Sequence, residues 1–347
     1  MKVLVYTDVQ ACERAERCRE RPEMPLQLHR TARFFSEAER LARKHGVGAV
    51  WDLGDTLDDR SDISVPTLQV TEAGLRWLMR GLQPTTCYKL IGNHEQYEKA
   101  AHTHTGGLFQ PFFRVVADHA VFDWTSLEDG GPWIVAVAFP YGAGEADWIR
   151  DAVDRGKKKG ARVVVIGHLP LLGASLPAGR LSAGLDPKCL EGADLALLGH
   201  VHRHQRISQN VWYVGSPFQQ DFGEAADTKH VALLDTQTLS VEFPSLSGFP
   251  RYRVTEASDL SEGFEPGEDR WNIVVRSREQ AQVIYGRPWA AHVELEYVYK
   301  TEEPGREAEE AGDLSPEALL RDYMSRNPPG LDEARTLDLG LKLLRGD

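Results

Sequence analysis

The sequence of 347 residues predicts an α/β layered fold followed by a smaller C-terminal region. Two observations lead to this prediction. In the first two hundred residues, short apolar runs that end in polar, often glycine-containing clusters alternate with stretches in which apolar residues recur at helical spacing. Apolar residues make up 41% of the chain and charged residues 27%, which is the balance of an ordinary globular protein and excludes collagen-like, coiled-coil and wholly disordered chains.

Six of the apolar runs predict strands that are buried on both faces. They cover residues 3–6, 49–53, 87–91, 133–139, 163–166 and 195–198. Between the first three runs, apolar residues at helical spacing predict two helices that end near Gly46 and Gly81. Further strand-like segments at residues 211–214, 231–235 and 240–243 are expected to complete a second sheet.

The main domain is expected to span residues 1–248, because a Gly-Phe-Pro sequence follows at that point. A smaller region, residues 249–300, carries predicted strands at 271–275 and 292–299. Residues 301–347 begin with an acidic, low-complexity stretch and continue as two predicted amphipathic helices joined by Pro-Pro-Gly. Such a pair suits a module that binds a partner, and packing against the chain's own domain is the alternative.

Charge and cysteine usage limit the classes of function. Acidic residues number 52 and basic residues 40, a net charge of -12, which argues against binding nucleic acid by bulk charge alone. A phosphate-bearing substrate therefore needs a basic groove or bound metal. The four cysteines lack C-x-x-C spacing, so a cytoplasmic location is expected, in a host cell if the protein is encoded by a phage. No apolar run approaches the roughly 18 residues of a membrane span, and no membrane partner is expected.

Polar clusters follow five of the predicted strands, where α/β sheets place their ligands. A lone Asp at a strand end is more often a helix cap, and a lone His is more often structural. Five such clusters brought side by side by a parallel sheet instead predict one shared site. The clusters are Asp-Val-Gln at 8–10, Gly-Asp-Thr-Leu-Asp at 54–58, Gly-Asn-His-Glu at 92–95, Gly-His at 167–168 and Gly-His-Val-His at 199–202.

The ligand types select the chemistry. Carboxylate and imidazole groups without thiolates favour Mn²⁺, Fe or Zn²⁺ over Ca²⁺ or an iron–sulfur centre. Two such cations about 3.5 to 4 Å apart can activate water and bind a phosphoryl group.

The order of the clusters resembles the calcineurin-like metallophosphoesterase superfamily. That family's pattern is Asp-x-His, Gly-Asp-x-x-Asp, Gly-Asn-His-Glu/Asp, Gly-His and Gly-His-x-His, and four of the five clusters match it in full. The resemblance covers residues 1–243. It implies a four-layer α-β-β-α sandwich with a smaller C-terminal α+β capping domain, residues 249–300, and a helical tail.

Carried over by position, the resemblance implies two divalent metal ions that share Asp55. The first would be held by Asp8, Gln10, Asp55 and His202, and the second by Asp55, Asn93, His168 and His200. His94 would be the histidine that protonates the leaving oxygen, with Asp58 placed to orient it. Gln10 stands where the family usually has His. Because its amide oxygen is a weaker and harder donor, Mn²⁺ is the expected metal, with Mg²⁺, Fe or Zn²⁺ as alternatives.

Further residues narrow the expected substrate. Asp59 and the Gln96–Tyr97 pair stand where protein phosphatases of this superfamily carry arginines, which argues against a phosphomonoesterase of that type. Residues 213–224 resemble the segment after the last metal motif of SbcD-type nucleases, the nuclease subunits of double-strand-break repair complexes.

This second resemblance implies a DNA nuclease that acts in repair or recombination. A 3′-to-5′ exonuclease is expected, with endonuclease activity as an open possibility. The implied partners are DNA, an SMC-like coiled-coil ATPase of the SbcC type that binds the tail, and a second copy of the chain in a homodimer. Two alternatives stay open: a small-molecule or nucleotide phosphodiesterase or phosphatase with residues 250–347 as a lid, and a weakly active scaffold subunit.

Overall fold

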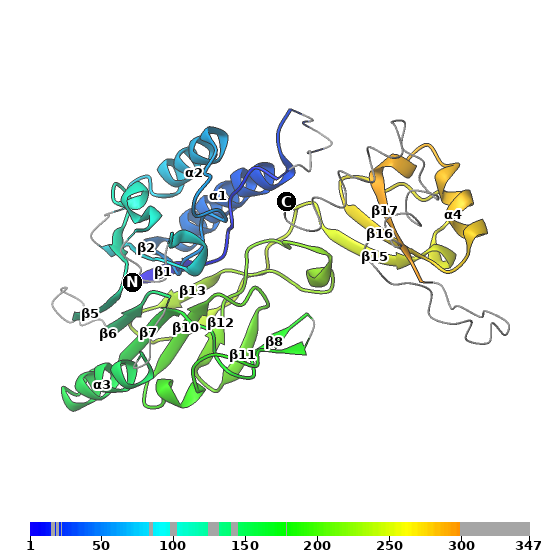
Figure 1. The fold of residues 1–347 in the computed structure, drawn as a ribbon. Coiled ribbons are helices and arrows are strands. Elements are labelled where there is room, and N and C mark those ends of the chain that lie inside the picture. Colours follow the sequence, from blue (N-terminus) through cyan, green and yellow to red (C-terminus); the bar gives the residue numbers. More distant parts are fainter. Residues whose placement is uncertain are drawn as a thin grey trace, which may run out of the picture. The chain divides into compact units, whose positions relative to one another are not determined.

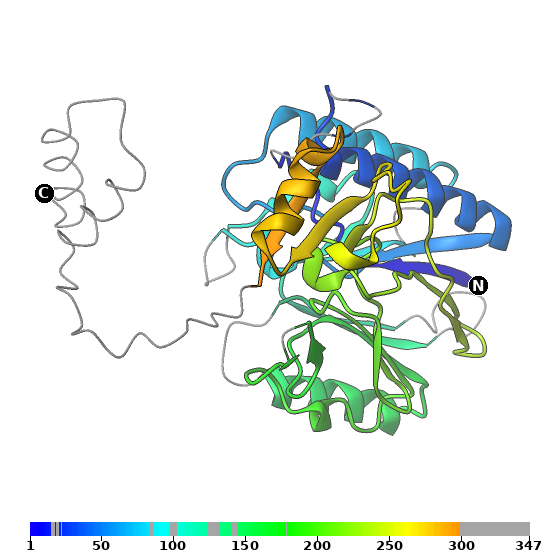
Figure 2. The ribbon, with the colours of Figure 1, turned by 90° about the vertical axis from the view of Figure 1, so that its right-hand side faces the viewer.

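The protein folds as a mixed α/β sandwich in which two six-stranded sheets face each other (Figures 1 and 2). The computed structural model describes residues 1–14, 18, 21, 23–82, 86–97, 103–123, 132–139, 145–177 and 179–298. Residues 1–298 belong to one compact unit. The predicted linker and helical tail, residues 301–347, lie outside the described residues.

The first sheet has the strand order β14-β13-β1-β2-β3-β4. Its parallel strands are β1 (Lys2–Tyr6), β2 (Val47–Asp52), β3 (Tyr88–Leu90) and β4 (Arg114–Val116). β13 (Ala232–Asp235) pairs antiparallel with β1, and β14 (Val241–Glu242) pairs antiparallel with β13. The last two strands were expected in the second sheet. They join the first one because the chain returns to the free edge of β1.

The second sheet has the order β11-β12-β10-β7-β6-β5. Four strands are parallel: β6 (Trp133–Val137), β7 (Val163–His168), β10 (Leu195–Gly199) and β12 (Val211–Tyr213). The antiparallel strands β5 (His119–Asp123) and β11 (Gln205–Ser208) form its edges. A short hairpin of β8 (Ser175–Leu176) and β9 (Gly179–Arg180) stands apart from both sheets.

Helices cover the outer faces of the sheets and complete the four layers (Figure 2). α1 (Leu26–His45) and α2 (Val65–Leu78) lie on the first sheet, and α3 (Glu145–Lys158) lies on the second. The ring of Phe34 on α1 packs edge-on against Tyr6 at 5.2 Å between centroids. α1 ends as predicted at Gly46, whose φ of 63° is the left-handed conformation that terminates a helix.

The strand pattern explains how both sheets are buried. On β7, Val164 and Ile166 belong to the core between the two sheets, whereas Val163 and Val165 belong to the core under α3. Because successive side chains point to opposite faces, a strand covered on both sides is mainly apolar, and a charged residue in it needs a buried partner, as Lys89 of β3 and Asp52 of β2 provide for each other. The six mainly apolar runs of the sequence are these covered strands.

The smaller region consists of a three-stranded parallel sheet and one helix. The strands are β15 (Tyr252–Glu256), β16 (Arg270–Val275) and β17 (Val293–Tyr297), and the helix is α4 (Arg278–Tyr285). Its small core includes Ile273, Ile284 and Trp289. The buried Arg30 of α1 donates to the carbonyl of Pro250 at 2.8 Å, and its guanidinium lies over the Tyr252 ring. These contacts join the beginning of the smaller region to α1.

Short 3₁₀ turns connect the longer elements. They cover Asn93–Glu95, Thr105–Phe109, Pro187–Leu190, Phe222–Glu224, Ala257–Asp259 and Ala290–His292. Within the described part of the chain, no helix has the length and apolar character needed to cross a membrane.

Candidate active site

The predicted site residues come from the carboxyl ends of strands in both sheets. Asp8, Asp55 and Asn93 follow β1, β2 and β3 of the first sheet, while His168 and His200 lie at the ends of β7 and β10 of the second. The sequence pattern suggested neighbouring loops of one parallel sheet. Two sheets that face each other instead bring the loops together from opposite sides, which surrounds the site with ligands.

The backbone at this site is unusual. Among the described residues, five that are not glycine have positive φ angles, and four of these five are predicted metal ligands: Asp8 (54°), Gln10 (49°), Asp55 (55°) and His200 (88°). A positive φ disfavours residues with a Cβ atom and is found where the surroundings enforce it, often at functional sites. The tight turns aim these side chains inward.

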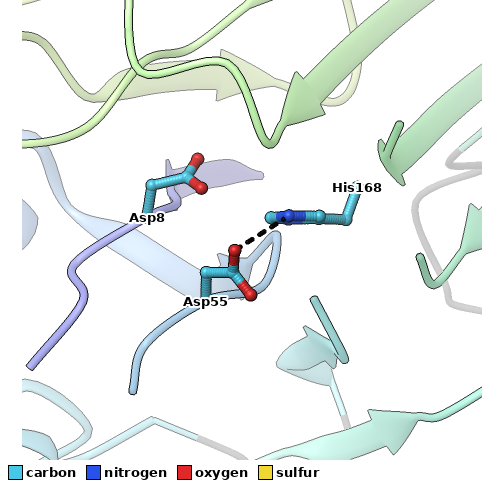
Figure 3. A group of neighbouring side chains, drawn as sticks. All are labelled: Asp8, Asp55 and His168. Atoms are coloured by element: carbon cyan, nitrogen blue, oxygen red, sulfur yellow. Dashed lines mark ion pairs between the residues drawn. The ribbon is translucent and has the colours of Figure 1, made fainter. Parts of the chain in front are cut away.

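Three of the predicted ligands form a compact group. Asp8, Asp55 and His168 each offer a ligand atom, and these atoms lie within 4.8 Å of one another (Figure 3). His168 Nε2 is 3.1 Å from Asp55 Oδ2. All three side chains are buried. A buried pair of carboxylates is costly unless cations neutralise it, so this group suits a metal ion.

The two carboxylate oxygens of Asp8 have different surroundings. Oδ2 accepts hydrogen bonds from the Thr7 hydroxyl at 2.7 Å and from the backbone N–H of His200 at 3.0 Å. Oδ1 has no hydrogen-bond partner among the described residues, and it lies 3.8 Å from His202 Nε2. Buried polar atoms are almost always paired, so this oxygen is oriented for a ligand that comes from outside the chain.

The remaining predicted ligands extend the same cluster. Asn93 Oδ1 lies 3.1 Å from His168 Nε2 and 2.8 Å from His200 Nδ1. The side-chain amide nitrogen of Gln10 is 3.1 Å from His202 Nε2, and a half-turn of the amide would present its oxygen instead. Each of the seven predicted ligands is therefore within 3.8 Å of another one.

The charges in the site favour a cation. Burial alone would raise the pKa of Asp55, but His168 and the N–H of His94 lower it to about 2. Burial alone would lower the pKa of His168, but Asp55 and Asp8 raise it to about 9. The carboxylates thus stabilise positive charge at this position. A metal ion would supply that charge in place of the proton on His168.

His94 lies beside this cluster, and its ring contacts Asp58. Its Nδ1 is 2.9 Å from the Asp58 carbonyl and 3.2 Å from the carboxylate oxygen Oδ1. The hydrogen bond with the Asp58 side chain raises the pKa of His94 to about 9 against the effect of burial. The Asp58 carboxylate thus favours the protonated form of the ring in the metal-free protein.

Arg14 is a neighbour of this pair that no motif in the sequence identified. Its Nη2 donates to Asp58 Oδ2 at 3.2 Å, and its Nη1 donates to the carbonyl of Gln220 at 3.1 Å. Burial would raise the pKa of Asp58, but hydrogen bonding with His94 and the positive charge of Arg14 keep it below its usual value. The Asp58 carboxylate therefore contacts His94 through Oδ1 and is held by Arg14 through Oδ2.

A network of buried charged side chains holds the loops that carry Asp55 and Asn93. Glu95 accepts the backbone N–H groups of Asp55 at 3.2 Å, Thr56 at 3.0 Å and Gly92 at 3.2 Å, and it pairs with Lys89 at 2.8 Å. Lys89 also pairs with Asp52 at 3.0 Å, and all three charged side chains are inaccessible to solvent. One carboxylate thereby joins the Asp55 loop to the Asn93 loop. A Cβ atom on Gly92 would lie 2.0 Å from Asp55 Oδ1, so only glycine permits this approach.

The ligand types gathered at this site suit a metal-dependent phosphoesterase, and the family match shows that class. Residues 1–204 match the calcineurin-like phosphoesterase family, and the chain belongs to that family. Membership implies divalent metal ions, for which the cluster around Asp8, Asp55 and His168 is the candidate site.

The chain is similar to two further proteins. Exonuclease subunit 1 of Enterobacteria phage T4 is 25% identical over 216 residues, a match that covers 60% of this chain and only 59% of that protein's length. A dimetal phosphatase from Danio rerio aligns with a TM-score of 0.47 and 11% identity over 71% of this chain and 99% of its own.

Proposed function

We propose that this chain is a DNA nuclease that requires two divalent cations, with Mn²⁺ as the preferred metal. The observation that carries the proposal is the similarity to a phage exonuclease subunit, in a chain that has a phosphoesterase ligand set and, beside it, a histidine bonded to Asp58. The likeness of residues 213–224 to the SbcD-type segment supports the same substrate. DNA repair or recombination in the cytoplasm is the proposed setting.

The proposed ligand sets divide the cluster into two sites that share Asp55. Asp8, Gln10, Asp55 and His202 would hold one cation, and Asp55, Asn93, His168 and His200 the other. When bound, the cations would lower the pKa of a water molecule and neutralise the charge of a phosphate group. This local positive charge offsets the net charge of -12, which would otherwise repel DNA.

The proposed role of His94 is that of a general acid. Breaking a phosphodiester bond leaves negative charge on a sugar oxygen, and His94 would donate its proton to that oxygen. Asp58 would keep the ring oriented and protonated, while Arg14 holds the Asp58 carboxylate in place. The proposed partners are an SMC-like ATPase of the SbcC type, bound by residues 301–347, and a second copy of the chain.

Asp58→Asn is expected to shift the pH dependence of the reaction. Because the Asp58 carboxylate raises the pKa of His94, its loss lowers that pKa. A general acid must carry its proton, and a ring with a lower pKa loses that proton at a lower pH. The alkaline limb of the kcat/KM profile should therefore move to lower pH. An unmoved limb in this variant would argue against the role of Asp58.

The nuclease proposal is tested with the full-length protein and linear duplex DNA labelled at its 5′ ends. With Mn²⁺ we expect stepwise shortening of each strand from its 3′ end, and a chelator should stop the reaction. Bis-p-nitrophenyl phosphate and p-nitrophenyl phosphate serve as small comparison substrates. Turnover of these compounds but not of DNA, even with an SbcC-type ATPase present, would refute the nuclease assignment.

A further inference from the structure

A buried carboxylate lies directly behind one of the proposed metal ligands. Glu224, at the end of the 3₁₀ turn Phe222–Glu224, is only 3% exposed, and its Oε1 is 2.8 Å from His202 Nδ1. His202 Nδ1–H donates to this carboxylate, so the lone pair of the ring is at Nε2. That atom faces Gln10 at 3.1 Å and Asp8 Oδ1 at 3.8 Å.

The position of Glu224 is fixed by contacts to its second oxygen. Oε2 accepts from Lys229 Nζ at 2.6 Å and from the backbone N–H of Gln220 at 3.0 Å. Lys229 is also buried, and its Nζ donates to the carbonyl of His202 at 3.1 Å and to the Ser216 hydroxyl at 2.9 Å. The lysine thus binds both the carboxylate and the backbone of the histidine that the carboxylate orients.

At the other proposed metal site, which has two histidines, His168 bonds a neutral acceptor instead of a carboxylate. His168 Nδ1 donates to the backbone carbonyl of Leu53 at 2.8 Å, which is a neutral acceptor. A charged acceptor makes an imidazole a stronger electron donor at its other nitrogen than a neutral one does. His202 and His168 therefore differ as ligands, and the stronger of these two is next to Gln10, whose amide oxygen is a weaker donor than an imidazole.

We infer that Glu224 is a positioning residue that strengthens His202 as a metal ligand and so compensates for Gln10 at the site formed with Asp8. This inference rests on the proposed function, because it requires that Asp8, Gln10 and His202 hold a cation. Removing an acceptor of this kind commonly weakens metal binding about 10- to 100-fold. The effect should be confined to the site that contains His202.

The test is a titration of metal-free, full-length protein with Mn²⁺, in which electron paramagnetic resonance measures the free ion. For Glu224→Gln we expect one of the two binding steps to weaken about 10- to 100-fold and the other to stay unchanged. Glu224→Asp keeps the charge and should retain more of the affinity than Glu224→Gln. Glu191→Gln, at an exposed position of the same domain, is the matched control and should bind as the parent protein does.

The outcomes separate this inference from the function on which it rests. If Glu224→Gln binds both ions with the parent affinity, or if both steps weaken equally, Glu224 has no selective role and the inference is wrong, although the nuclease proposal stands. If the parent protein binds no Mn²⁺, the proposed function itself fails. Thermal unfolding of the metal-free variants identifies any loss of folding, and Glu224→Asp then provides the measurement.

Discussion

Replacing His94 with alanine is expected to reduce DNA hydrolysis about 10²- to 10⁴-fold, the usual contribution of a general acid, while Mn²⁺ binding is retained. His94 is outside the proposed ligand set, and its ring is bonded to Asp58. The variant therefore loses the proton donor without losing a ligand. Rates on labelled duplex DNA and Mn²⁺ titration of the same preparation measure the two effects separately.

Substrates with different leaving groups test proton donation by His94 more directly. A p-nitrophenolate group leaves readily without a proton, whereas the sugar oxygen of DNA does not. His94→Ala should therefore lose much less activity on bis-p-nitrophenyl phosphate than on DNA. His45→Ala, at the end of α1 in the outer helical layer, is the matched histidine control and should leave both activities unchanged. Equal losses on both substrates would contradict proton donation by His94.

The sequence predicts the buried strands well because burial on both faces leaves a continuous apolar run. Five of the six runs are followed by the polar clusters that form the site. The order and spacing of the motifs in these clusters indicate the protein family. The sequence does not predict to which sheet a strand belongs. β13 pairs with β1, more than two hundred residues earlier, and local patterning contains no information on such a partner. Short or edge strands such as β4 and β11 also lack an apolar run and were not predicted.

The supporting residues of the site were hidden in the sequence for a related reason. Arg14 is an ordinary charged residue in a polar segment. Glu224 ends the segment 213–224 that the sequence singled out, but that resemblance gave the residue no role, and only the fold brings the two side chains to Asp58 and His202. Lys89 did carry a signal, because a lysine inside an apolar strand must find buried carboxylates. Motifs thus reveal the groups that contact metal and substrate. The residues that orient those groups depend on long-range contacts.

Asp55→Asn is expected to have the most severe effect of any single substitution in the site. The carboxylate lies near members of both proposed ligand sets: a ligand atom of Asp55 is within 4.8 Å of one from Asp8 and one from His168, and Oδ2 is 3.1 Å from His168 Nε2. Asparagine keeps the size but removes the negative charge and one oxygen. Since Asp55 is the proposed shared ligand, both cations should bind more weakly, and DNA hydrolysis should fall to the background rate.

Asp8→Asn is the matched comparison for the shared role of Asp55. Asp8 belongs to only one of the two proposed sites, so its amide variant should still bind one Mn²⁺ per chain with the parent affinity, whereas Asp55→Asn should weaken both binding steps. The metal-free state adds an independent check, because Asp55 raises the pKa of His168. In Asp55→Asn that pKa should fall, which the ring proton signals would report by nuclear magnetic resonance. A variant that lost Asp55 yet kept either Mn²⁺ site intact would exclude a ligand shared between two ions.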